Sequence, residues 1–339
     1  MINVALIGTG YWGPNVANSF VASERANIAG LCDLDPARLA SFSQRYPNAK
    51  ATNRLADILE DPTITAVAVA TPTNTHYAIA KAALEAGKHV LVEKPLTLTS
   101  EESRRLGELA DEVGKVLMVG HIFLYNSTIR ALKDLIDRAE LGDVLAMSFV
   151  RTNLGPVRTD VNALWDLATH DISIMSYLMG AEPVAVSAMG QSFLNKGVED
   201  VVFATFTFPN GALANVHASW LNPRKVRTLT ITGSQKMAVW DDLELKEPVL
   251  VFDKRVDLPT AAELKGDFME YKTMCVDGGM SSVPVKLNRP LQSECEHFLD
   301  CIASGSRPLT DALNGAAVVR ALEAATLSLA QGGAPVEIR

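Results

Sequence analysis

Cysteine is scarce in this chain of 339 residues, which holds only Cys32, Cys275, Cys295 and Cys301. These four form no Cys-x-x-Cys pair, and no histidine stands at the spacing that zinc ligands require. We therefore expect buried or idle thiols and no metal site.

Long apolar runs are also lacking, since no stretch approaches the roughly eighteen residues that a membrane span needs. The first residues, Met1 to Asn3, lead directly into a short apolar run without a basic segment or a cleavage site. The net charge of -8 comes from scattered residues of both signs, which argues against a nucleic-acid-binding surface. We therefore expect a soluble, cytoplasmic protein that binds neither nucleic acid nor membrane.

Short apolar runs alternate with helical patterns through the first 120 residues, a rhythm that predicts βαβ units and a parallel sheet. Each run is almost continuously apolar, as expected of strands that carry helices on both faces of their sheet. The predicted strands are Asn3–Ile7, Ile28–Cys32, Ala66–Ala70, His89–Glu93 and Val116–Gly120.

Two helices between these strands carry clear terminal signals. A helix is predicted over 74–86, where Gly87 suits the left-handed conformation that ends helices. A second is predicted over 99–113, where Thr99 and Glu102 fit a capping box and Gly114 follows the end.

The pattern changes after residue 122, where a second domain is expected. Helices are predicted over 127–139 and 164–179, then strands joined by turns, and finally helices over 291–304 and 311–330. Pro209-Asn210-Gly211 and Gly233-Ser234 each join two strand-like runs, which indicates antiparallel hairpins. With a length that suits two domains, we predict an α/β domain over residues 1–122 and an α+β domain over 123–339.

Gly8-Thr9-Gly10-Tyr11-Trp12-Gly13 matches the dinucleotide-binding pattern G-x-G-x-x-G and directly follows the first strand. Asp33 stands twenty residues past Gly13 at the end of the second strand, where its carboxylate can bind the ribose hydroxyls of NAD and repel the 2′-phosphate of NADP. This context predicts that the cofactor is NAD. FAD is the alternative dinucleotide, but it would need different sequence features downstream. The alternative is an ordinary strand-to-helix turn, with Asp33 capping a helix from Pro36 onward.

Two further segments follow strands at the carboxyl edge of the sheet, where dinucleotides lie. Thr71-Pro72-Thr73-Asn74-Thr75-His76 could line the cofactor crevice, although Thr73 or Asn74 could equally cap the next helix. Glu93-Lys94-Pro95 carries Lys94 beside any nicotinamide bound there, where its ammonium could polarise a reacting hydroxyl. The Lys94–Pro95 bond is expected to be trans by default.

In the second domain, Asp166 and His170 stand four residues apart in a predicted helix and so share one face. A histidine oriented by an aspartate can take the proton of a hydroxyl as hydride leaves. The alternative is a helix-capping aspartate beside a histidine with an ordinary packing role. His121 and Tyr125 are further candidates for contact with substrate or nicotinamide. Candidate anchors for an anionic substrate are Arg151, Arg158, Arg224, Lys225 and Arg227.

Taken together, the glycine motif, Asp33, the segment 70–76, Glu93-Lys94-Pro95 and the Asp166-x-x-x-His170 helix resemble the Gfo/Idh/MocA oxidoreductases. The resemblance implies a Rossmann domain followed by an open, mainly antiparallel sheet that often makes the oligomer interface, so we expect a dimer or tetramer. It assigns Lys94, Asp166 and His170 to catalysis and to the substrate, to which we add Tyr125 for its position near the carboxyl edge and Arg151 as an anionic anchor. We also add His121 to the cofactor site for its position at the end of a strand. The residues that the resemblance assigns to the cofactor are Gly8, Gly10, Tyr11, Trp12, Gly13, Asp33, Thr71, Asn74, His76, Glu93 and Lys94.

Within that family, residues 10–15, 120–126 and 162–166 are similar to the branch that contains nucleotide-sugar 3-dehydrogenases and enzymes that oxidise aminoglycoside sugars. The resemblance therefore implies NAD-linked oxidation of a secondary sugar hydroxyl at C3, in a UDP-hexosamine or its uronate. The alternatives are an aminoglycoside intermediate, an inositol or other polyol, and a non-catalytic sensor of NAD(H).

Overall fold

The computed structural model describes residues 1–155, 157–159, 161–256 and 275–339. The chain forms two compact units. Unit 1 contains residues 1–125 and 288–323, and unit 2 contains residues 126–287 and 324–339.

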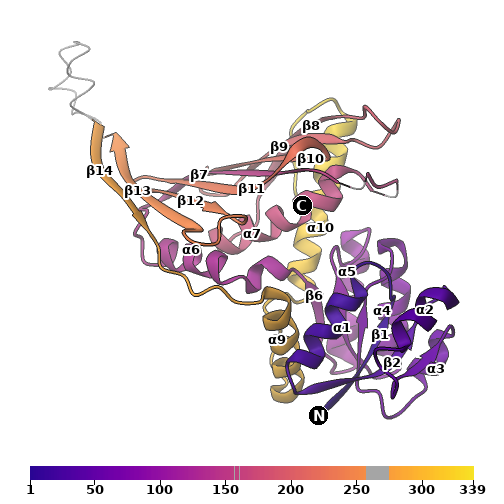
Figure 1. Ribbon diagram of the computed structural model, residues 1–339. Coiled ribbons are helices and arrows are strands. Elements are labelled where there is room, and N and C mark those ends of the chain that lie inside the picture. The colour runs from indigo at the N-terminus through magenta and orange to yellow at the C-terminus, as the bar shows by residue number, and fades with distance from the viewer. Residues whose placement is uncertain (156, 160, 257–274) are drawn as a thin grey trace, which may run out of the picture. The chain divides into compact units, whose positions relative to one another are not determined.

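Unit 1 is built on a parallel sheet in which the described residues form six strands in the order β3-β2-β1-β4-β5-β6 (Figure 1). The order reverses direction between β1 and β4, which is the switch point where doubly wound sheets bind ligands at their carboxyl edge. The strands are β1 Ile2–Ile7, β2 Ala26–Cys32, β3 Lys50–Thr52, β4 Ala66–Val69, β5 His89–Glu93 and β6 Leu117–Gly120.

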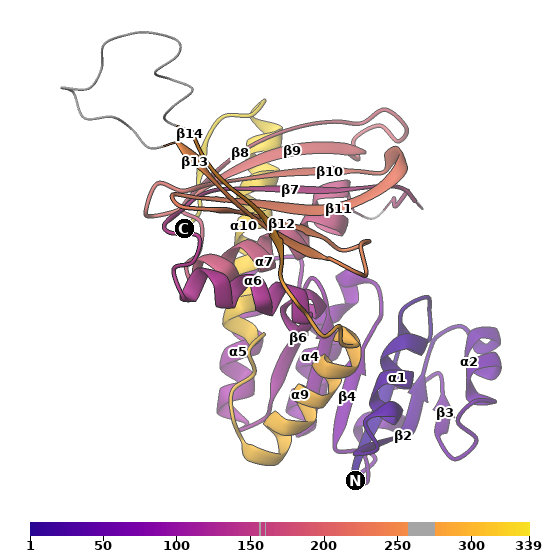
Figure 2. The ribbon, with the colours of Figure 1, turned by 60° about the vertical axis from the view of Figure 1, so that its left-hand side comes forward.

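Helices cover both faces of this sheet because both faces are apolar. Ala5 and Ile7 pack into a core with α3, α4 and α5, whereas Leu6 faces α1. On this side α9 contacts α1 (Figure 2). There Phe20 meets Phe298 of α9 edge to face, with ring centroids 6.1 Å apart. The helices are α1 Gly13–Ala22, α2 Pro36–Ser43, α3 Leu55–Leu59, α4 His76–Glu85, α5 Ser100–Glu112 and α9 Pro290–Ser304, with the 3₁₀ turns η1 Thr73–Thr75 and η2 Ile122–Tyr125.

The strands and helix ends expected in this unit are confirmed to within two residues. Thr99 caps α5 by accepting a hydrogen bond from the N–H of Glu102 at 3.2 Å, and Gly87 ends the α4 turn with φ +72°. The edge strand β3 was not predicted, because its three residues carry no apolar run and its first two are exposed.

The division of the chain differs from the predicted one beyond residue 125, because residues 288–323 return to unit 1. The side-chain amide of Asn288 donates to the backbone carbonyl of Tyr125 at 2.8 Å, where the segment re-enters the unit. The Tyr125 hydroxyl then bonds the Thr310 hydroxyl at 3.0 Å. The predicted boundary at 122/123 is thus close to the observed one, but the second domain is not one continuous stretch.

Unit 2 is built on a mixed, mostly antiparallel sheet, in which the described residues form nine strands in the order β14-β13-β12-β11-β7-β10-β9-β8-β15. The hairpin at Pro209-Asn210-Gly211 is confirmed as the antiparallel pair β9 and β10, but β10 pairs with β7 in parallel. The strands are β7 Val144–Leu154, β8 Ala185–Gln191, β9 Val201–Thr207, β10 Leu213–Ser219, β11 Leu221–Gly233, β12 Met237–Asp241, β13 Val249–Val256, β14 Cys275–Ser282 and β15 Val336–Glu337.

Helices α6 (Ser127–Asp137) and α7 (Thr169–Met179) lie along one face of this sheet (Figure 1). A π-helical turn, Leu164–Ala168, leads into α7. Helix α10 (Ala312–Ala330) contains the 323/324 boundary between the units. The two units together confirm the predicted α/β fold with a Rossmann sheet and an open, mainly antiparallel sheet.

Candidate functional site

The glycine-rich loop after β1 has the shape that a dinucleotide requires. A Cβ atom on Gly8, which has φ +96°, would lie 2.6 Å from the Ala70 carbonyl oxygen. One on Gly13 would lie 2.2 Å from the Gly8 carbonyl oxygen, so only glycine lets α1 begin this close to the strand. A Cβ on Gly10 would meet nothing closer than Arg38 at 3.7 Å. The loop thus has open space at its middle glycine, before the positive N-terminus of a helix where a pyrophosphate binds.

Asp33 is oriented by the same loop. One carboxylate oxygen accepts the backbone N–H and the hydroxyl of Thr9 at 2.7 and 2.8 Å, and the other accepts the N–H of Asp35 at 2.9 Å. Although partial burial opposes ionisation, these donors hold the pKa of Asp33 below its ordinary value. Asp35, and not Asp33, caps α2 by accepting from the N–H groups of Ala37 and Arg38. The alternative cap function for Asp33 is therefore wrong.

The segment after β4 is tied to the turn after β5 through His76. The His76 ring lies between two backbone carbonyl oxygens, with Nδ1 2.9 Å from Pro95 and Nε2 2.9 Å from Thr71. Asn74 is exposed in the 3₁₀ turn before α4, and the residue at the cap position, Thr75, makes no side-chain capping bond. Capping by Thr73 or Asn74 therefore does not explain this segment.

The turn after β5 holds Lys94 at the carboxyl edge of the sheet. The Lys94–Pro95 peptide bond is cis, contrary to the default expectation. The Glu93 carboxylate accepts the Lys94 backbone N–H at 3.3 Å and the indole N–H of Trp12, which stands in the glycine-rich loop. Sequence reasoning had placed Trp12 and Glu93 near the same cofactor without predicting that they bond to each other.

His121 and Tyr125 follow β6 and are fully buried. Neither ring nitrogen of His121 has a hydrogen-bond partner among the described residues. Burial, together with the charge of Lys94, lowers the pKa of His121 to about 3, so this imidazole is neutral at working pH. The bond from Tyr125 to Thr310 accounts for its burial without a ligand, and its contact with substrate stays a prediction.

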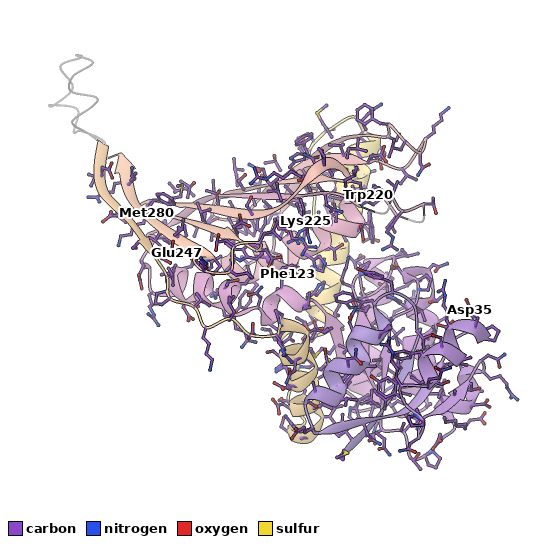
Figure 3. The ribbon with its side chains drawn as sticks, viewed as in Figure 1. Asp35, Phe123, Trp220, Lys225, Glu247 and Met280 are labelled. Atoms are coloured by element: carbon purple, nitrogen blue, oxygen red, sulfur yellow. The ribbon has the colours of Figure 1, made fainter. Side chains whose placement is uncertain are left out.

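In unit 2, Asp166 lies in the π-helical turn before α7. Its two carboxylate oxygens accept the indole N–H of Trp220 at 3.1 Å and a guanidinium N–H of Arg158 at 3.3 Å. Trp220, labelled in Figure 3, lies between β10 and β11 and is 1% exposed. Sequence reasoning missed this contact, since 54 residues separate the partners. Turns of π-helix are rare in proteins as a whole, but those that occur are often found at functional sites. This location suits the candidate function of Asp166.

His170 stands in the first turn of α7 and is partly exposed, whereas its neighbour Asp171 is buried. Asp171 accepts two N–H groups of Arg151, at 2.9 and 2.7 Å, in a pair whose side chains are 2–3% exposed. This buried pair gives Arg151 a structural function that the sequence did not suggest. Its contact with substrate, like the pairing of Asp166 with His170, stays a prediction.

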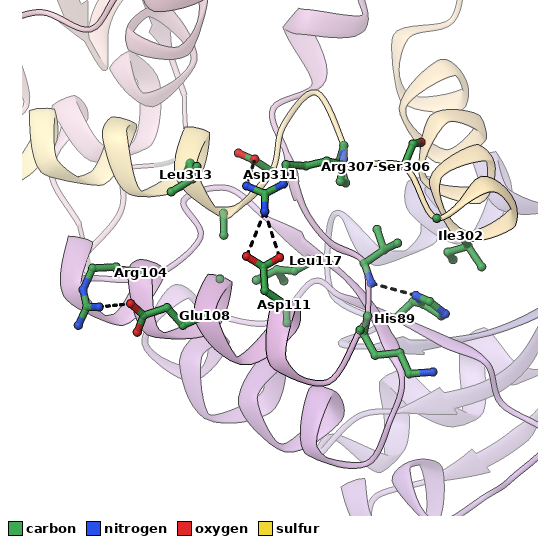
Figure 4. A pocket seen from close by; sticks show the side chains of 18 residues that line it. His89, Arg104, Glu108, Asp111, Leu117, Ile302, Ser306, Arg307, Asp311 and Leu313 are labelled. Atoms are coloured by element: carbon green, nitrogen blue, oxygen red, sulfur yellow. Dashed lines mark hydrogen bonds and ion pairs between the residues drawn. The ribbon is translucent and has the colours of Figure 1, made fainter.

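A hollow of about 570 Å³ opens elsewhere in unit 1, at the opposite, amino edge of β5 and β6. There Arg307 bonds both carboxylate oxygens of Asp111 at 3.1 and 3.0 Å, and Arg104 pairs with Glu108 (Figure 4). Its charged walls largely satisfy one another, and its position separates it from the carboxyl edge where the candidate site residues of unit 1 lie.

Three of the four cysteines, Cys32, Cys295 and Cys301, are buried free thiols, while the side chain of Cys275 lies outside the described part of the chain. Within the described ranges, no group of three or more His, Cys, Asp or Glu side chains is placed to hold a metal ion. Likewise, none of the helices that the structure describes is long and apolar enough to cross a membrane.

A Rossmann sheet with this glycine loop, and with an aspartate at the end of the second strand, is typical of an NAD-dependent oxidoreductase. The family comparison is more specific. Residues 2–121 match the NAD-binding Rossmann domain of the Gfo/Idh/MocA oxidoreductase family, and residues 129–239 match a C-terminal domain of the same family. The chain belongs to the Gfo/Idh/MocA family.

Similar proteins act on sugars and cyclitols. UDP-N-acetylglucosamine 3-dehydrogenase from Acidithiobacillus ferrooxidans is 31% identical over 243 residues, which cover 71% of this chain and 74% of that protein. The scyllo-inositol 2-dehydrogenase (NAD(+)) of Bacillus subtilis is 27% identical, covering 99% of this chain and 96% of its own length.

Solved structures show the same overall fold. The crystal structure of UDP-N-acetylglucosamine 3-dehydrogenase GnnA from Acidithiobacillus ferrooxidans superposes with a TM-score of 0.81 at 27% identity, covering 97% of each chain. GenD2 from gentamicin A biosynthesis, in complex with NAD, gives a TM-score of 0.82 at 27% identity, covering 100% of this chain and 96% of that one. NAD is the cofactor of the present chain.

Proposed function

We propose that this enzyme oxidises a secondary hydroxyl, at C3, of a nucleotide-activated sugar of the UDP-hexosamine or UDP-uronate type. The observation that carries the proposal is the similarity to UDP-N-acetylglucosamine 3-dehydrogenase over 71% of the chain. Lys94, in the loop after β5, and the pair Asp166 and His170 are the groups that we propose for this reaction.

The proposed chemistry divides between these groups. NAD, held by the glycine-rich loop and Asp33, would supply the hydride acceptor. Lys94 donates a hydrogen bond to the reacting oxygen and stabilises its developing negative charge. His170 takes the hydroxyl proton as a general base, and Asp166, held by Trp220 and Arg158, orients the imidazole. In the reverse direction, His170 returns the proton to the ketone.

Basic residues of unit 2 support an anionic substrate. Arg227 is paired with Asp242 at 3.2 Å and Arg158 with Asp166, so both are already engaged. Arg224 and Lys225 on β11 are exposed, and within the described residues neither forms an ion pair. Arg224 is four residues from Trp220, no more than about 14 Å of extended chain. This spacing suits a diphosphate bound beyond a sugar near Asp166.

A substrate panel read by NADH absorbance tests the proposal. UDP-hexosamines and their uronates are expected to reduce NAD, and free hexosamines and inositols to do so poorly. Lys94→Ala and His170→Ala are each expected to lower kcat by about 10²–10⁴-fold, because each removes a group that acts on the reacting hydroxyl. Lys81→Ala, an exposed lysine paired with Glu85 on α4, serves as the matched control.

Other outcomes decide between the alternatives. Near-normal turnover in both active-site variants, with NAD still bound, would contradict the assignment of Lys94 and His170. Preferential oxidation of an aminoglycoside precursor would favour the activity suggested by GenD2. Oxidation of inositols alone would favour that of the scyllo-inositol relative. Tight NADH binding without any turnover would favour a sensor. A dimer or tetramer stays a prediction, tested by light scattering.

A further inference from the structure

Unit 1 contains a second buried carboxyl group that the proposed chemistry does not use. Glu294 lies on α9 and is 1% exposed, and its Oε1 has no hydrogen-bond partner among the described residues. An ionised carboxylate in such a place costs several kcal/mol, so the group takes up a proton instead. Glu294 is therefore held as the neutral acid.

Glu93 has the opposite surroundings. It accepts the indole N–H of Trp12 and the backbone N–H of Lys94, and it lies beside the Lys94 ammonium. Gly120 on the neighbouring strand makes room for it, since a Cβ there would lie 3.2 Å from its Oε2. Donors and a cation stabilise the ionised form of Glu93, while Glu294 has neither.

Two neighbouring titratable groups, Cys295 and His121, carry no charge beside this pair. Burial raises the pKa of Glu294 well above its ordinary value, and repulsion by Glu93 adds to the shift. The pKa of the adjacent Cys295 thiol is likewise raised, by burial and by the carboxyl groups of Glu294, Glu93 and Glu296. His121 is neutral. One proton on the pair therefore leaves one carboxylate opposite one ammonium, a balanced charge in a poorly hydrated place.

We propose that Glu93 and Glu294 share one proton, carried by Glu294, and that Glu294 is thereby a positioning residue that acts on Lys94 through Glu93. With Glu294 neutral, the single carboxylate is free to hold Lys94 and the Trp12 loop together. The effect on Lys94 rests on the proposed function, because it assumes that Lys94 acts in the sugar oxidation. The state of the proton itself is a property of the folded chain and can be measured without a substrate.

The first test is thermal unfolding against pH. A carboxyl group that stays protonated in the folded state, but ionises near pH 4.5 when unfolded, contributes stability that is lost as pH rises. Glu294→Gln removes this loss because the amide cannot ionise. The variant should match the wild type near about pH 5 and melt roughly 5–10 °C above it near about pH 8.

Glu296→Gln is the matched control, since it makes the same change two residues further along α9 at a carboxyl that is hydrogen-bonded to Gln292. Its melting difference from the wild type should not vary with pH. A Glu294→Gln difference that is equally flat, or that turns against the variant as pH rises, overturns the proposal, because Glu294 would then be ionised.

The second test reads the effect on Lys94. Burial raises the pKa of Glu93 to about 7 despite its favourable partners, so NADH binding and turnover should change as pH falls through about 7. Glu294→Ala removes the buried carboxyl group and leaves space on α9 that water can enter, which should lower the pH at which turnover changes by about one unit and reduce kcat about tenfold. Glu294→Gln fills the same space with a neutral group, so the pH dependence of turnover should return to that of the wild type.

The outcomes separate this proposal from the proposed function. An equal pH dependence of turnover in the wild type and both variants, with only melting affected, would reduce Glu294 to a packing residue. If no sugar is oxidised by the wild type, the proposed function fails, while the melting series and the pH dependence of NADH binding still decide where the proton lies.

Discussion

Two aspartates in one turn of unit 1 show how neighbouring residues of the same type acquire different tasks. Asp35 gives its carboxylate to the first N–H groups of α2, whereas Asp33 is fixed by Thr9 with its charge retained at the end of β2. This arrangement supports the prediction that Asp33 accepts hydrogen bonds from the ribose hydroxyls of NAD, and its negative charge would be unfavourable to a 2′-phosphate.

Replacing Asp33 is expected to change the choice of cofactor. Asp33→Ala should weaken NAD binding by about 10- to 100-fold, because hydrogen bonds to a charged acceptor contribute roughly 1.5–3 kcal/mol. The same change should narrow the preference over NADP, since the repulsion disappears. Fluorescence titration with NADH and NADPH measures both effects.

Asp35→Ala is the control for that experiment, because it removes a helix cap from the same turn. We expect it to lower stability by about 1 kcal/mol without altering the preference between the two cofactors. A change of preference in Asp35→Ala, or none in Asp33→Ala, would contradict the assignment of the ribose site to Asp33.

Single residues could be predicted where their type has one dominant physical use. Gly8 and Gly13 could be predicted as parts of a dinucleotide-binding loop because no other residue fits so close to the backbone. Asp33 could be predicted as its partner because of its spacing from Gly13 in the sequence. Contacts such as Trp12 with Glu93 and Trp220 with Asp166 could not be predicted, because indole groups hydrogen-bond to many acceptors and the partners lie far apart in sequence.

At the scale of elements, the strands of the parallel sheet were the most predictable, since a short and continuously apolar run between two helical patterns rarely forms anything but a buried strand. The parallel pairing of β10 with β7 was not, because that pairing depends on how the chain crosses the sheet. The helix from Asp166 was predicted in outline, but its first turn is π-helical, a winding for which the apolar spacing gives no separate signal.

Strand β11 provides a prediction at this scale, through its exposed Arg224 and Lys225. Replacing both by alanine should raise KM for a nucleotide sugar about tenfold or more, while kcat changes little, because the lost attraction acts on a part of the substrate remote from the reaction. The salt dependence of KM should also weaken.

The control for this pair is Arg138→Ala, an exposed arginine just after α6, for which no change in KM is expected. An unchanged KM in the double variant, or an equal effect on an uncharged sugar, would remove the support for a diphosphate at this strand.

For the whole molecule, the main departure from expectation is that unit 1 is discontinuous. The sequence predicts a domain boundary near residue 122, because the alternation of strands and helices stops there, and unit 1 first ends at Tyr125. Nothing in the composition of residues 288–323 marks their return, since an apolar helix face can pack on either unit. The contact of Phe298 with Phe20 and the bonds of Tyr125 to Thr310 and Asn288 reveal this return.

Joining the two parts of unit 1 provides a direct prediction. Residues 1–125 linked to 288–323 by a short Gly-Ser segment should fold and bind NADH, because Asn288 already touches the Tyr125 carbonyl. Residues 1–125 alone should not, since Phe20 would lose the helix that covers it. Circular dichroism melting and NADH fluorescence report the two results.

Phe298→Ala within the linked protein is the matched control and should cost about 3–5 kcal/mol of stability. Independent folding and NADH binding by residues 1–125 would show that α9 is dispensable for unit 1.

The contact between Asn288 and Tyr125 also bears on how proteins of this architecture diversify. The chain departs from unit 1 after Tyr125 and returns to it at Asn288, so most of unit 2 is encoded by one continuous segment, residues 126–287, and residues 324–339 complete it. Exchange of that one coding segment would leave the glycine loop, Asp33 and the Lys94 turn untouched. Recombination at this point offers a lineage a new substrate without the loss of an inherited cofactor.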